Sequence, residues 1–456
     1  MAGLFSALSI AVSAMEAEQG ALEVTSNNIA NVNTPGYSRE VPVLQENPPV
    51  DLANLQFGTG VTLSSVQSIR DNILELRLNQ ETSQQNLLDT QVDGLNQIQA
   101  LFNDPAGSGL QTVISNFFNS FQQLAADPSS SSDRQAVIIA GQTLATAFNQ
   151  TANALTTQQQ SLDQSVVQSV SQINGLTSQI ASLNQQIAAS QSAGADSGVL
   201  VDQRTQLIRQ LSQVMNISVT DEGNGAVTVA AANGAALVVG NQSFNLSTQT
   251  NPATGFHDVF YQGTDITSAI QSGQLGGQIQ LRDTEIPSVL SSLDTLASGI
   301  ANAVNTTSTA GFDANGNPGV DFFVPPAAGP GAAANLAVAI TDPSLVAASS
   351  DGTAGSNGNA NALAALANQN IVGGQTPTDY YANLVAQIGN DASNAQTQQQ
   401  SESLVLQQLQ DQRGSVSGVS LNEEAANLIQ YQNAYQAAAQ LAGIIDQLTQ
   451  SLINEI

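Results

Sequence analysis

The side chains that could support catalysis are few in this sequence. His257 is the only histidine; it stands between Phe256 and Asp258, and no nucleophile-elbow sequence accompanies it. We therefore expect a surface histidine rather than a member of a catalytic triad. Glu423 and Glu424 form a carboxylate pair of the kind used in general acid–base catalysis. They also fall in the first turn of a predicted helix, where negative charge complements the helix dipole, so we expect no catalytic residue here.

One segment could bind a metal ion. The run Asp313-Ala-Asn-Gly-Asn-Pro-Gly-Val-Asp321 places oxygen ligands at alternate positions, as calcium-binding loops do. Pro318 stands where such a loop needs glycine, and Val324 stands where its bidentate glutamate belongs. A turn built from Asn and Gly is the better explanation, so we predict neither a metal site nor a cofactor.

The composition excludes most other chemistry. The 456 residues contain no cysteine and no lysine, so all basic residues are arginine. Thiol nucleophiles, zinc fingers, phosphate-loop lysines and Schiff-base lysines are therefore not possible. The net charge of −28 disfavours binding to nucleic acid and to anionic lipid, because both require basic contacts.

The sequence predicts neither a membrane span nor a cleaved signal peptide. No uninterrupted apolar stretch reaches about 18 residues, so we expect no membrane insertion. The first residues lack the basic segment of a signal peptide, and Glu16 and Glu18 interrupt their apolar run. If the protein leaves the cell, we expect it to use another route.

Each end of the sequence predicts a long amphipathic helix. The first should end before Pro35 and Gly36, because the residue before proline avoids the helical region. The last should begin at Ser420, and its two tyrosines are interpreted as packing residues. Apolar residues spaced three and four apart form the N-terminal seam Leu4, Leu8, Ala11, Met15, Leu22, Ile29 and Val32, interrupted at Glu18 and Thr25, and the C-terminal seam Leu428, Tyr431, Tyr435, Ala438, Ala442, Ile445 and Leu452.

The region between these helices changes character along the chain. Helical spacing dominates from about residue 70 to 194, short Val- and Ile-rich strands with Asn-Gly turns follow, and a Gly-, Ala- and Asn-rich stretch comes later. We predict an elongated α+β multidomain protein. Its expected parts are a terminal α-helical coiled coil (1–60 with 415–456), a long-helix bundle (61–205 with 283–305 and 376–414), a β-rich inserted domain (206–282) and an irregular insertion or outer loop region (306–375).

Periodicity leaves the role of the terminal helices open. Such a helix is marginal alone in water, because nucleation is costly and one apolar face stays wet. The two helices could pack on each other within one chain and only close a globular domain. They could equally seek further copies of the chain.

Local sequences favour the second alternative. The segment from Ser26 to Arg39 resembles the signature of the flagellar rod, hook and hook-associated protein family. Residues 417–436 are similar to the closing helix of that family, and Glu-Glu-Ala-Ala-Asn-Leu within them resembles the hook-associated branch more than hook or rod proteins. Segments 201–212, 273–283 and 311–323 agree, whereas 324–375 match least. The signature positions are Asn28, Asn31, Asn33, Pro35, Gly36 and Tyr37.

The resemblance implies a non-catalytic structural subunit at the junction between flagellar hook and filament. It implies a homo-oligomeric ring or helical zone on the hook protein, which carries the third hook-associated protein, with the filament cap and flagellin present during assembly. Export through the flagellar type III system without a cleaved signal, an extracellular location and a cytoplasmic export chaperone on the C-terminal helix are also implied. The terminal helices of the family become ordered on assembly.

Three rival functions are less well supported. A hook or rod protein differs in the interior helices, and flagellin lacks the Asn-Val-Asn-Thr-Pro-Gly-Tyr type of motif. A secreted coiled-coil adhesin would need a signal or an anchor. An enzyme would need the Lys, Cys or His clusters that this composition lacks.

Overall fold

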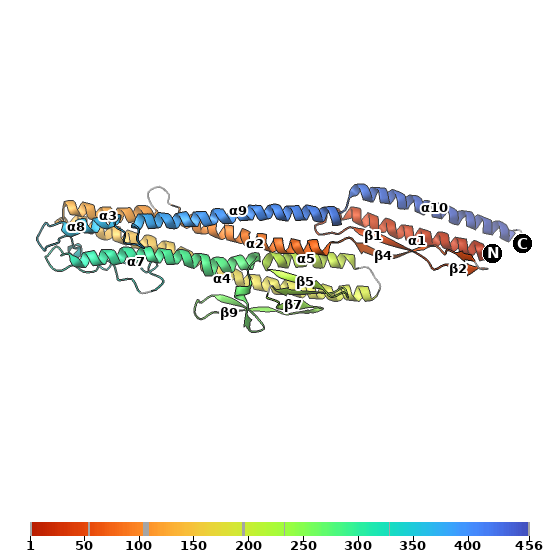
Figure 1. Ribbon diagram of the computed structural model, residues 1–456, viewed down its shortest axis with the longest axis horizontal. Helices are drawn as coiled ribbons and strands as arrows, with labels where there is room; N and C mark the ends of the chain where they lie inside the picture. Colours follow the sequence, from red (N-terminus) through yellow and green to blue (C-terminus); the bar gives the residue numbers. More distant parts are fainter. Residues whose placement is uncertain are drawn as a thin grey trace.

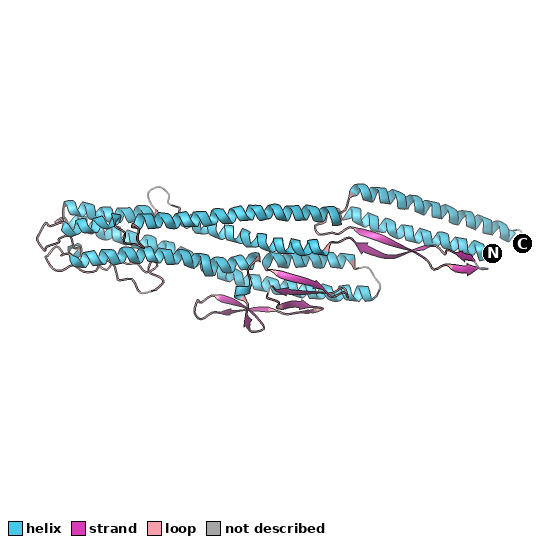
Figure 2. Cartoon of the chain, viewed as in Figure 1, coloured by secondary structure: helices cyan, strands magenta, loops and turns pink. Residues whose placement is uncertain are grey.

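The computed structural model describes residues 2–52, 55–103, 109–193, 197–231, 233–327 and 329–454. It shows an elongated molecule whose long helices run along its axis, with small sheets beside them (Figures 1 and 2). The two chain ends lie at the same extremity (Figure 1). This arrangement confirms the predicted elongated α+β fold.

The elements follow one another in this order. The helices are α1 (Ala2–Ala30), α2 (Asn72–Leu101), α3 (Leu110–Ala126), α4 (Ser131–Ser192), α5 (Gly198–Val214), α6 (Gly273–Gln280), α7 (Ile286–Ala310), α8 (Gly358–Ala365), α9 (Pro377–Ser417) and α10 (Leu421–Asn454). The strands are β1 (Glu40–Glu46), β2 (Val50–Leu52), β3 (Leu55–Phe57), β4 (Val61–Ser68), β5 (Ile217–Asp221), β6 (Val227–Ala231), β7 (Ala236–Val239), β8 (Gln242–Ser243), β9 (Leu246–Thr250), β10 (His257–Tyr261) and β11 (Thr264–Asp265). Short helical turns span Thr267–Ala269, Leu281–Glu285, Pro343–Leu345 and Leu366–Asn368.

Residues 2–68 and 421–454 form a unit that we call the terminal module. Helices α1 and α10 pack side by side and run antiparallel, and the two-stranded ribbon of β1 and β4 lies against α1 (Figure 1). Gly20 permits this contact, because a Cβ atom there would meet Leu63 of β4 at 2.6 Å. Pro42 is tolerated in β1 because both strands of a two-stranded sheet are edges.

Residues 72–417 form the second unit, which we call the rod, and it contains a large apolar core at the end remote from the termini. This core joins α2, α3, α7 and α9 to the first half of α4. Phe117 of α3 packs at its centre against Phe121, Phe322 and Phe323, with ring centroids 5.3 to 5.7 Å apart. Such aromatic contacts add to the stabilisation that burial of the rings provides.

The Gly- and Ala-rich region differs from the predicted irregular insertion in one respect. Residues 306–310 continue α7, and most of the segment that follows is irregular, as expected. However, Phe322, Phe323 and Ile340 are buried in the core of the rod. These parts of the region therefore pack against the helices and do not form an outer loop. A few apolar residues spaced widely in a polar context carry no period, which is why the sequence did not indicate this packing.

The β-rich region is narrower than predicted. Strands β5, β6, β7 and β8 form one antiparallel sheet, and β11, β10 and β9 form another. Together with α5, α6 and the second half of α4 they enclose a second apolar core. The predicted interval 206–282 therefore begins inside α5 and ends beyond α6. Residues 61–68, predicted to open the helical bundle, belong instead to β4 of the terminal module.

His257 is not the ordinary surface histidine that the sequence suggested. Asp163 of α4 accepts a hydrogen bond from the backbone N–H of His257 and lies 2.7 Å from its Nδ1. The same carboxylate pairs with Arg282, which is 1% exposed and also donates to the carbonyl of His257. The cluster thus ties β10 to α4 and to the helical turn that follows α6. The sequence could not show this, because these three residues are far apart along the chain.

Two carboxyl groups meet where α2 packs on α9. Glu402 of α9 lies beside Glu81 of α2, near the small apolar cluster of Leu74, Leu78 and Leu409. Burial and the charge of Glu81 raise the pKa of Glu402 to about 7. Protonation of Glu402 therefore removes a repulsion between two neighbouring carboxylates.

The raised pKa of Glu402 makes the stability of the rod sensitive to pH. The folded chain binds this proton more tightly than the unfolded chain does, so the stabilisation is fully present below pH 4.5 and is lost as pH rises through about 7. Glu402→Gln stays neutral and should flatten the profile of unfolding temperature within that window. Glu16→Gln, at an exposed position of α1, is the control. A Glu402→Gln profile parallel to that of the parent chain would contradict the assignment.

Candidate assembly interface

The predicted N-terminal seam lies at the border of the buried face of α1. Ala11 is buried, whereas Leu4, Leu8, Met15, Leu22, Ile29 and Val32 are each only half-buried. The fully buried positions include Ala17, Ala21, Val24 and Thr25. Small residues occupy this face because the β1–β4 ribbon and α10 both approach α1 closely. Thr25, which interrupts the seam in the sequence, is thus part of the contact.

The predicted C-terminal seam faces α1. Ala438 and Ile445 are buried, and Leu428, Tyr431, Tyr435 and Ala442 are half-buried, whereas Leu452 is 37% exposed. Burial and the carboxylates of Glu18 on α1 and Glu424 on α10 raise the pKa of Tyr431. The two seams therefore meet within one chain, which is the arrangement that periodicity alone had left open.

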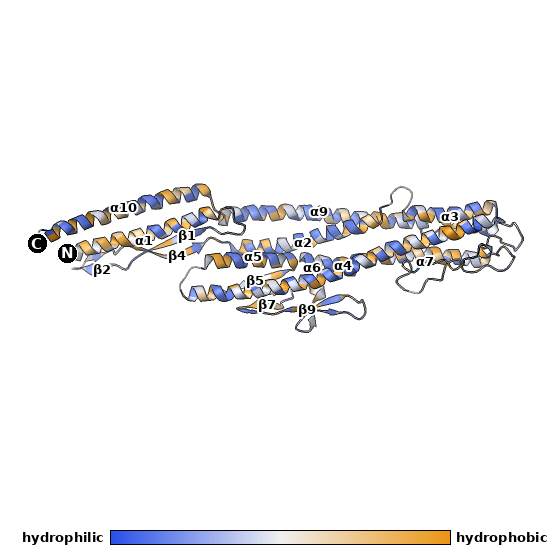
Figure 3. Cartoon of the chain, turned by 180° about the vertical axis from the view of Figure 1, so that it is seen from behind, coloured by the Kyte–Doolittle hydropathy of each residue, from blue (hydrophilic) through white to orange (hydrophobic). Residues whose placement is uncertain are grey.

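A second row of apolar residues on α10 remains uncovered. Leu441, Ile444 and Leu448 are 45%, 54% and 53% exposed, and their spacing of three and four places them in one line. We call these three residues the outer ridge. Phe5 and Val12 of α1 are also exposed, at 60% and 38%. Hydrophobic residues accordingly recur along the whole length of both terminal helices (Figure 3). None of these three residues was among the interface residues predicted from the sequence.

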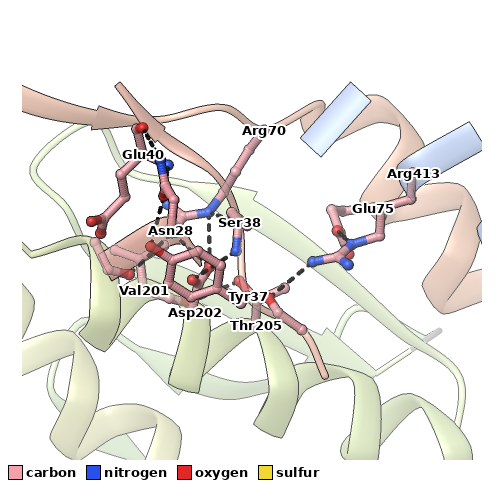
Figure 4. A network of polar contacts seen from close by, with 12 residues as sticks. Asn28, Tyr37, Ser38, Glu40, Arg70, Glu75, Val201, Asp202, Thr205 and Arg413 are labelled. Atoms are coloured by element: carbon pink, nitrogen blue, oxygen red, sulfur yellow. Dashed lines mark hydrogen bonds and ion pairs between the residues drawn. The ribbon is translucent and has the colours of Figure 1, made fainter. Parts of the chain in front are cut away.

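The signature residue Asn28 is the centre of a buried polar network (Figure 4). Its Nδ2 donates to the backbone carbonyl of Glu40 at 2.7 Å and to the carboxylate of Glu424 at 3.1 Å. Its Oδ1 accepts from the N–H of Glu40 and from the hydroxyl of Tyr37, both at 2.9 Å. Asn28 is 1% exposed, and every donor and acceptor of its amide is used. It therefore joins α1 to β1 and α10 simultaneously.

The remaining signature residues build the turn that follows α1. Asn31 accepts from the Thr34 hydroxyl, and the N–H of Tyr37 donates to the carbonyl of Thr34 at 3.2 Å. Gly36 has a φ of +87° and follows Pro35, which is the arrangement of a type II turn. This turn places Tyr37 over Asn28, where burial and the carboxylates of Glu40, Asp202 and Glu424 raise its pKa. Asn33 and Pro35 are exposed.

Polar contacts fasten this turn to the rod (Figure 4). The N–H of Ser38 donates to Asp202 of α5 at 3.0 Å, and Arg70 pairs with the same carboxylate at 2.7 Å. Arg413 of α9 donates to the carbonyl of Gly36 at 3.0 Å and pairs with Glu75. Sequence reasoning identified Gly36 but did not identify the charged partners Arg70, Glu75, Asp202 and Arg413, because they lie far from this turn along the chain.

The candidate chemical groups serve structural roles. Asp313 uses one carboxylate oxygen to accept the N–H groups of Asn315 and Asn317, both at 2.8 Å, and so closes a turn. Glu423 pairs with Arg39, whereas Glu424 is hydrogen-bonded to the buried Asn28. The two carboxylates therefore do not form the arrangement that a general acid–base pair requires. Within the described ranges, no group of three or more His, Cys, Asp or Glu side chains could hold a metal ion. No helix in the same part of the chain has the length and apolarity to cross a membrane.

The network around Asn28 predicts an effect on the terminal module alone. Asn28→Ala removes partners from the buried carboxylate of Glu424 and from the N–H of Glu40, at a cost of about 1–3 kcal/mol for each group left unsatisfied. Limited proteolysis followed by mass spectrometry should show cleavage in α1 and α10 faster by roughly tenfold or more, with cleavage of the rod unchanged. Asn33→Ala, at an exposed position of the same motif, should match the parent chain. Equal cleavage of the two variants would contradict the assigned role.

Three family profiles match this chain. The profile described as the flagellar hook-associated protein FlgK helical domain covers residues 95–323. A flagella basal body rod protein profile covers residues 8–37, and a flagellar basal body rod FlgEFG protein C-terminal profile covers residues 412–455. The two basal-body protein profiles thus fall on the two ends of the chain, where α1 and α10 pack on each other.

Comparison with individual proteins gives the same result. Flagellar hook-associated protein 1 of Bacillus subtilis (strain 168) is 31% identical over 100% of this chain and 99% of its own length. The Escherichia coli (strain K12) protein of that name is 29% identical over 97% and 98% of the two chains. The structure of the flagellar hook junction protein FlgK from Burkholderia pseudomallei shares the fold, with a TM-score of 0.67 and 20% identity over 75% of this chain and 100% of that one. This chain belongs to the flagellar hook-associated protein 1 family.

Proposed function

We propose that this chain is a structural subunit of the hook–filament junction of the bacterial flagellum and that it polymerises through its terminal module. The carrying observation is the outer ridge of α10, which stays uncovered although α1 and α10 already pack on each other. The ridge belongs to α10, which lies at the extremity of the molecule that holds both chain ends (Figure 1).

The energetics favour burial of this ridge between subunits. Complete burial of a leucine or isoleucine side chain contributes about 1.5–3 kcal/mol, so covering three side chains that are about half exposed supplies roughly 2–4 kcal/mol per contact. The net charge of −28 opposes association of free subunits in solution. A head-to-tail contact, in which the ridge meets a different surface of the next copy, allows a ring or a helical zone to form.

The proposed partners follow from this position in the flagellum. Along the flagellum, the hook protein precedes the subunit, and the third hook-associated protein and then the filament follow it. The filament cap and flagellin are present during assembly. Because α10 has two apolar faces, it needs cover before assembly, and we assign that role to a cytoplasmic export chaperone. Export through the flagellar type III system without a cleaved signal would bring the subunit to its extracellular place.

We also propose that the subunit has no catalytic activity. The chain has no lysine and no cysteine, and its single histidine is bound to Asp163 beside the buried Arg282. Glu423 and Glu424 are likewise paired with Arg39 and Asn28. Residues with the chemistry for catalysis are thus used to hold elements together.

A charge on the outer ridge tests the proposal. A strain that lacks the gene should produce hooks without filaments and release flagellin into the medium. Ile444→Asp, expressed in that strain, should fail to restore filaments and swimming, because the charge cannot be buried between subunits. The purified variant should keep the unfolding temperature of the parent chain, since Ile444 is 54% exposed in the subunit.

Gln450→Asp is the matched control, because it adds the same charge to an exposed position on another side of α10. It should restore filaments, as counted by electron microscopy. Normal filaments with Ile444→Asp would show that the outer ridge is not an assembly surface.

A further inference from the structure

The basic residues of this chain are all arginines, and one of them differs from the rest. Among the residues that the structure describes, Arg77 of α2 has no hydrogen bond and no ion pair, and it is exposed. The other arginines bind carboxylates, a side-chain amide or backbone carbonyls of the same chain, and they are Arg39, Arg70, Arg134, Arg204, Arg209, Arg282 and Arg413. In a chain with a net charge of −28, a free guanidinium on the surface is therefore the exception.

Arg77 lies beside two apolar residues that also lack cover. Ile73 and Leu76 are 73% and 40% exposed. Ile73 lies three positions before Leu76 and four before Arg77, so the three side chains share one side of α2, which we call the α2 patch. Arginine is enriched in protein–protein contacts, because its guanidinium binds a carboxylate while its stem covers apolar surface. The α2 patch has this composition.

The outward side of α1 has the complementary composition. Four exposed residues recur there every three or four positions and form what we call the α1 stripe, namely Val12, Glu16, Gln19 and Glu23. Val12 and Glu16 are an apolar residue and a carboxylate four positions apart, which is the spacing of Ile73 and Arg77. Within the described part of the chain, Glu16 also has no hydrogen bond and no ion pair. A free cation and a free anion thus stand in matching apolar settings.

These two surfaces cannot meet within one folded chain. Helices α1 and α2 follow one another along the long axis and run in the same direction (Figure 1). Glu16 lies 14 residues before the end of α1 at Ala30, and Arg77 lies five residues after the start of α2 at Asn72. At a rise of 1.5 Å per residue, the two positions are about 30 Å apart along the axis.

A neighbouring copy that is shifted along the axis by this distance brings its α1 beside α2. The two helices are then parallel, because a shift preserves direction. The same register aligns three pairs of residues, namely Val12 with Ile73, Glu16 with Arg77, and Gln19 with Gln80. One displacement therefore satisfies the apolar residue and the charge simultaneously.

We propose that the α2 patch binds the α1 stripe of a neighbouring copy and that Arg77 pairs there with Glu16. The ion pair fixes the register between copies, since electrostatic complementarity contributes mainly to specificity. The contact joins two different surfaces, so it continues from copy to copy instead of closing a dimer. It does not require an ordered terminal module in the free subunit, because the α2 patch belongs to the rod and α1 is needed only in the polymer. This inference deepens the function proposed above and rests on it.

Disulfide cross-linking in assembled flagella tests the contact directly. The native chain has no cysteine, so Gln19→Cys combined with Gln80→Cys introduces one pair of thiols at exposed positions and leaves the proposed ion pair intact. Flagella isolated from a strain that expresses this variant should, after oxidation, give dimers and higher multimers of the chain on an immunoblot of a non-reducing gel. The two positions of one folded chain are too far apart for a disulfide. Gln19→Cys combined with Asn96→Cys, at an exposed position farther along α2, should give monomers.

Charge variants test the ion pair. In the strain that lacks the gene, Arg77→Gln should restore roughly tenfold fewer filaments than the native chain, because an arginine contact at an interface is lost. Asn96→Glu changes the net charge by the same single unit and should restore filaments. Arg77→Glu should fail, and adding Glu16→Arg should recover part of the loss. The purified Arg77 variants should keep the unfolding transition of the parent rod, since Arg77 has no partner within the described chain.

The two proposals fail in different ways. Flagella that contain the Gln19→Cys and Gln80→Cys chain but show no multimers, or normal filaments with Arg77→Gln, would overturn the contact between the α2 patch and the α1 stripe. Neither result would affect the assignment of the chain to the hook–filament junction. Filaments in the strain that lacks the gene would instead reject that assignment.

Discussion

The buried amide of Asn28 is the contact on which the terminal module depends. An asparagine at this point satisfies two groups of β1, the hydroxyl of Tyr37 and the carboxylate of Glu424 simultaneously. An aspartate would lack the donors, and an aliphatic residue would leave a buried charge without a partner. The geometry of this position therefore favours an amide over a carboxylate or an aliphatic side chain.

The contacts between the rod and the turn after α1 explain further features of the sequence. The turn after α1 requires glycine at residue 36, whose positive φ directs its carbonyl to Arg413. The segment 201–212, which resembled the family without an evident reason, supplies Asp202, Arg204 and Arg209 to three different neighbours. Local sequence thus carries contacts that only the fold brings together.

The sequence predicted which segments form the terminal helices better than it predicted which side of each helix is buried. The period of apolar residues located α1 and α10 and the end of α1 before Pro35, since helix periodicity and proline sterics are local properties. It did not show that α1 would bury Ala17, Ala21 and Thr25, because this depends on how closely the β1–β4 ribbon approaches. The pairings of Asp163 with Arg282 and of Glu81 with Glu402 were likewise beyond reach, since each joins residues more than a hundred positions apart.

Helix α4 has a thermodynamic consequence for the rod. Its 62 residues are continuous, and its first half lies in the core around Phe117 while its second half lies in the core beneath the β-rich region. Neither core can melt without exposing part of a helix that the other one holds. The rod should consequently unfold in one cooperative step, although its chain has two apolar centres and would be divided into separate domains by composition alone.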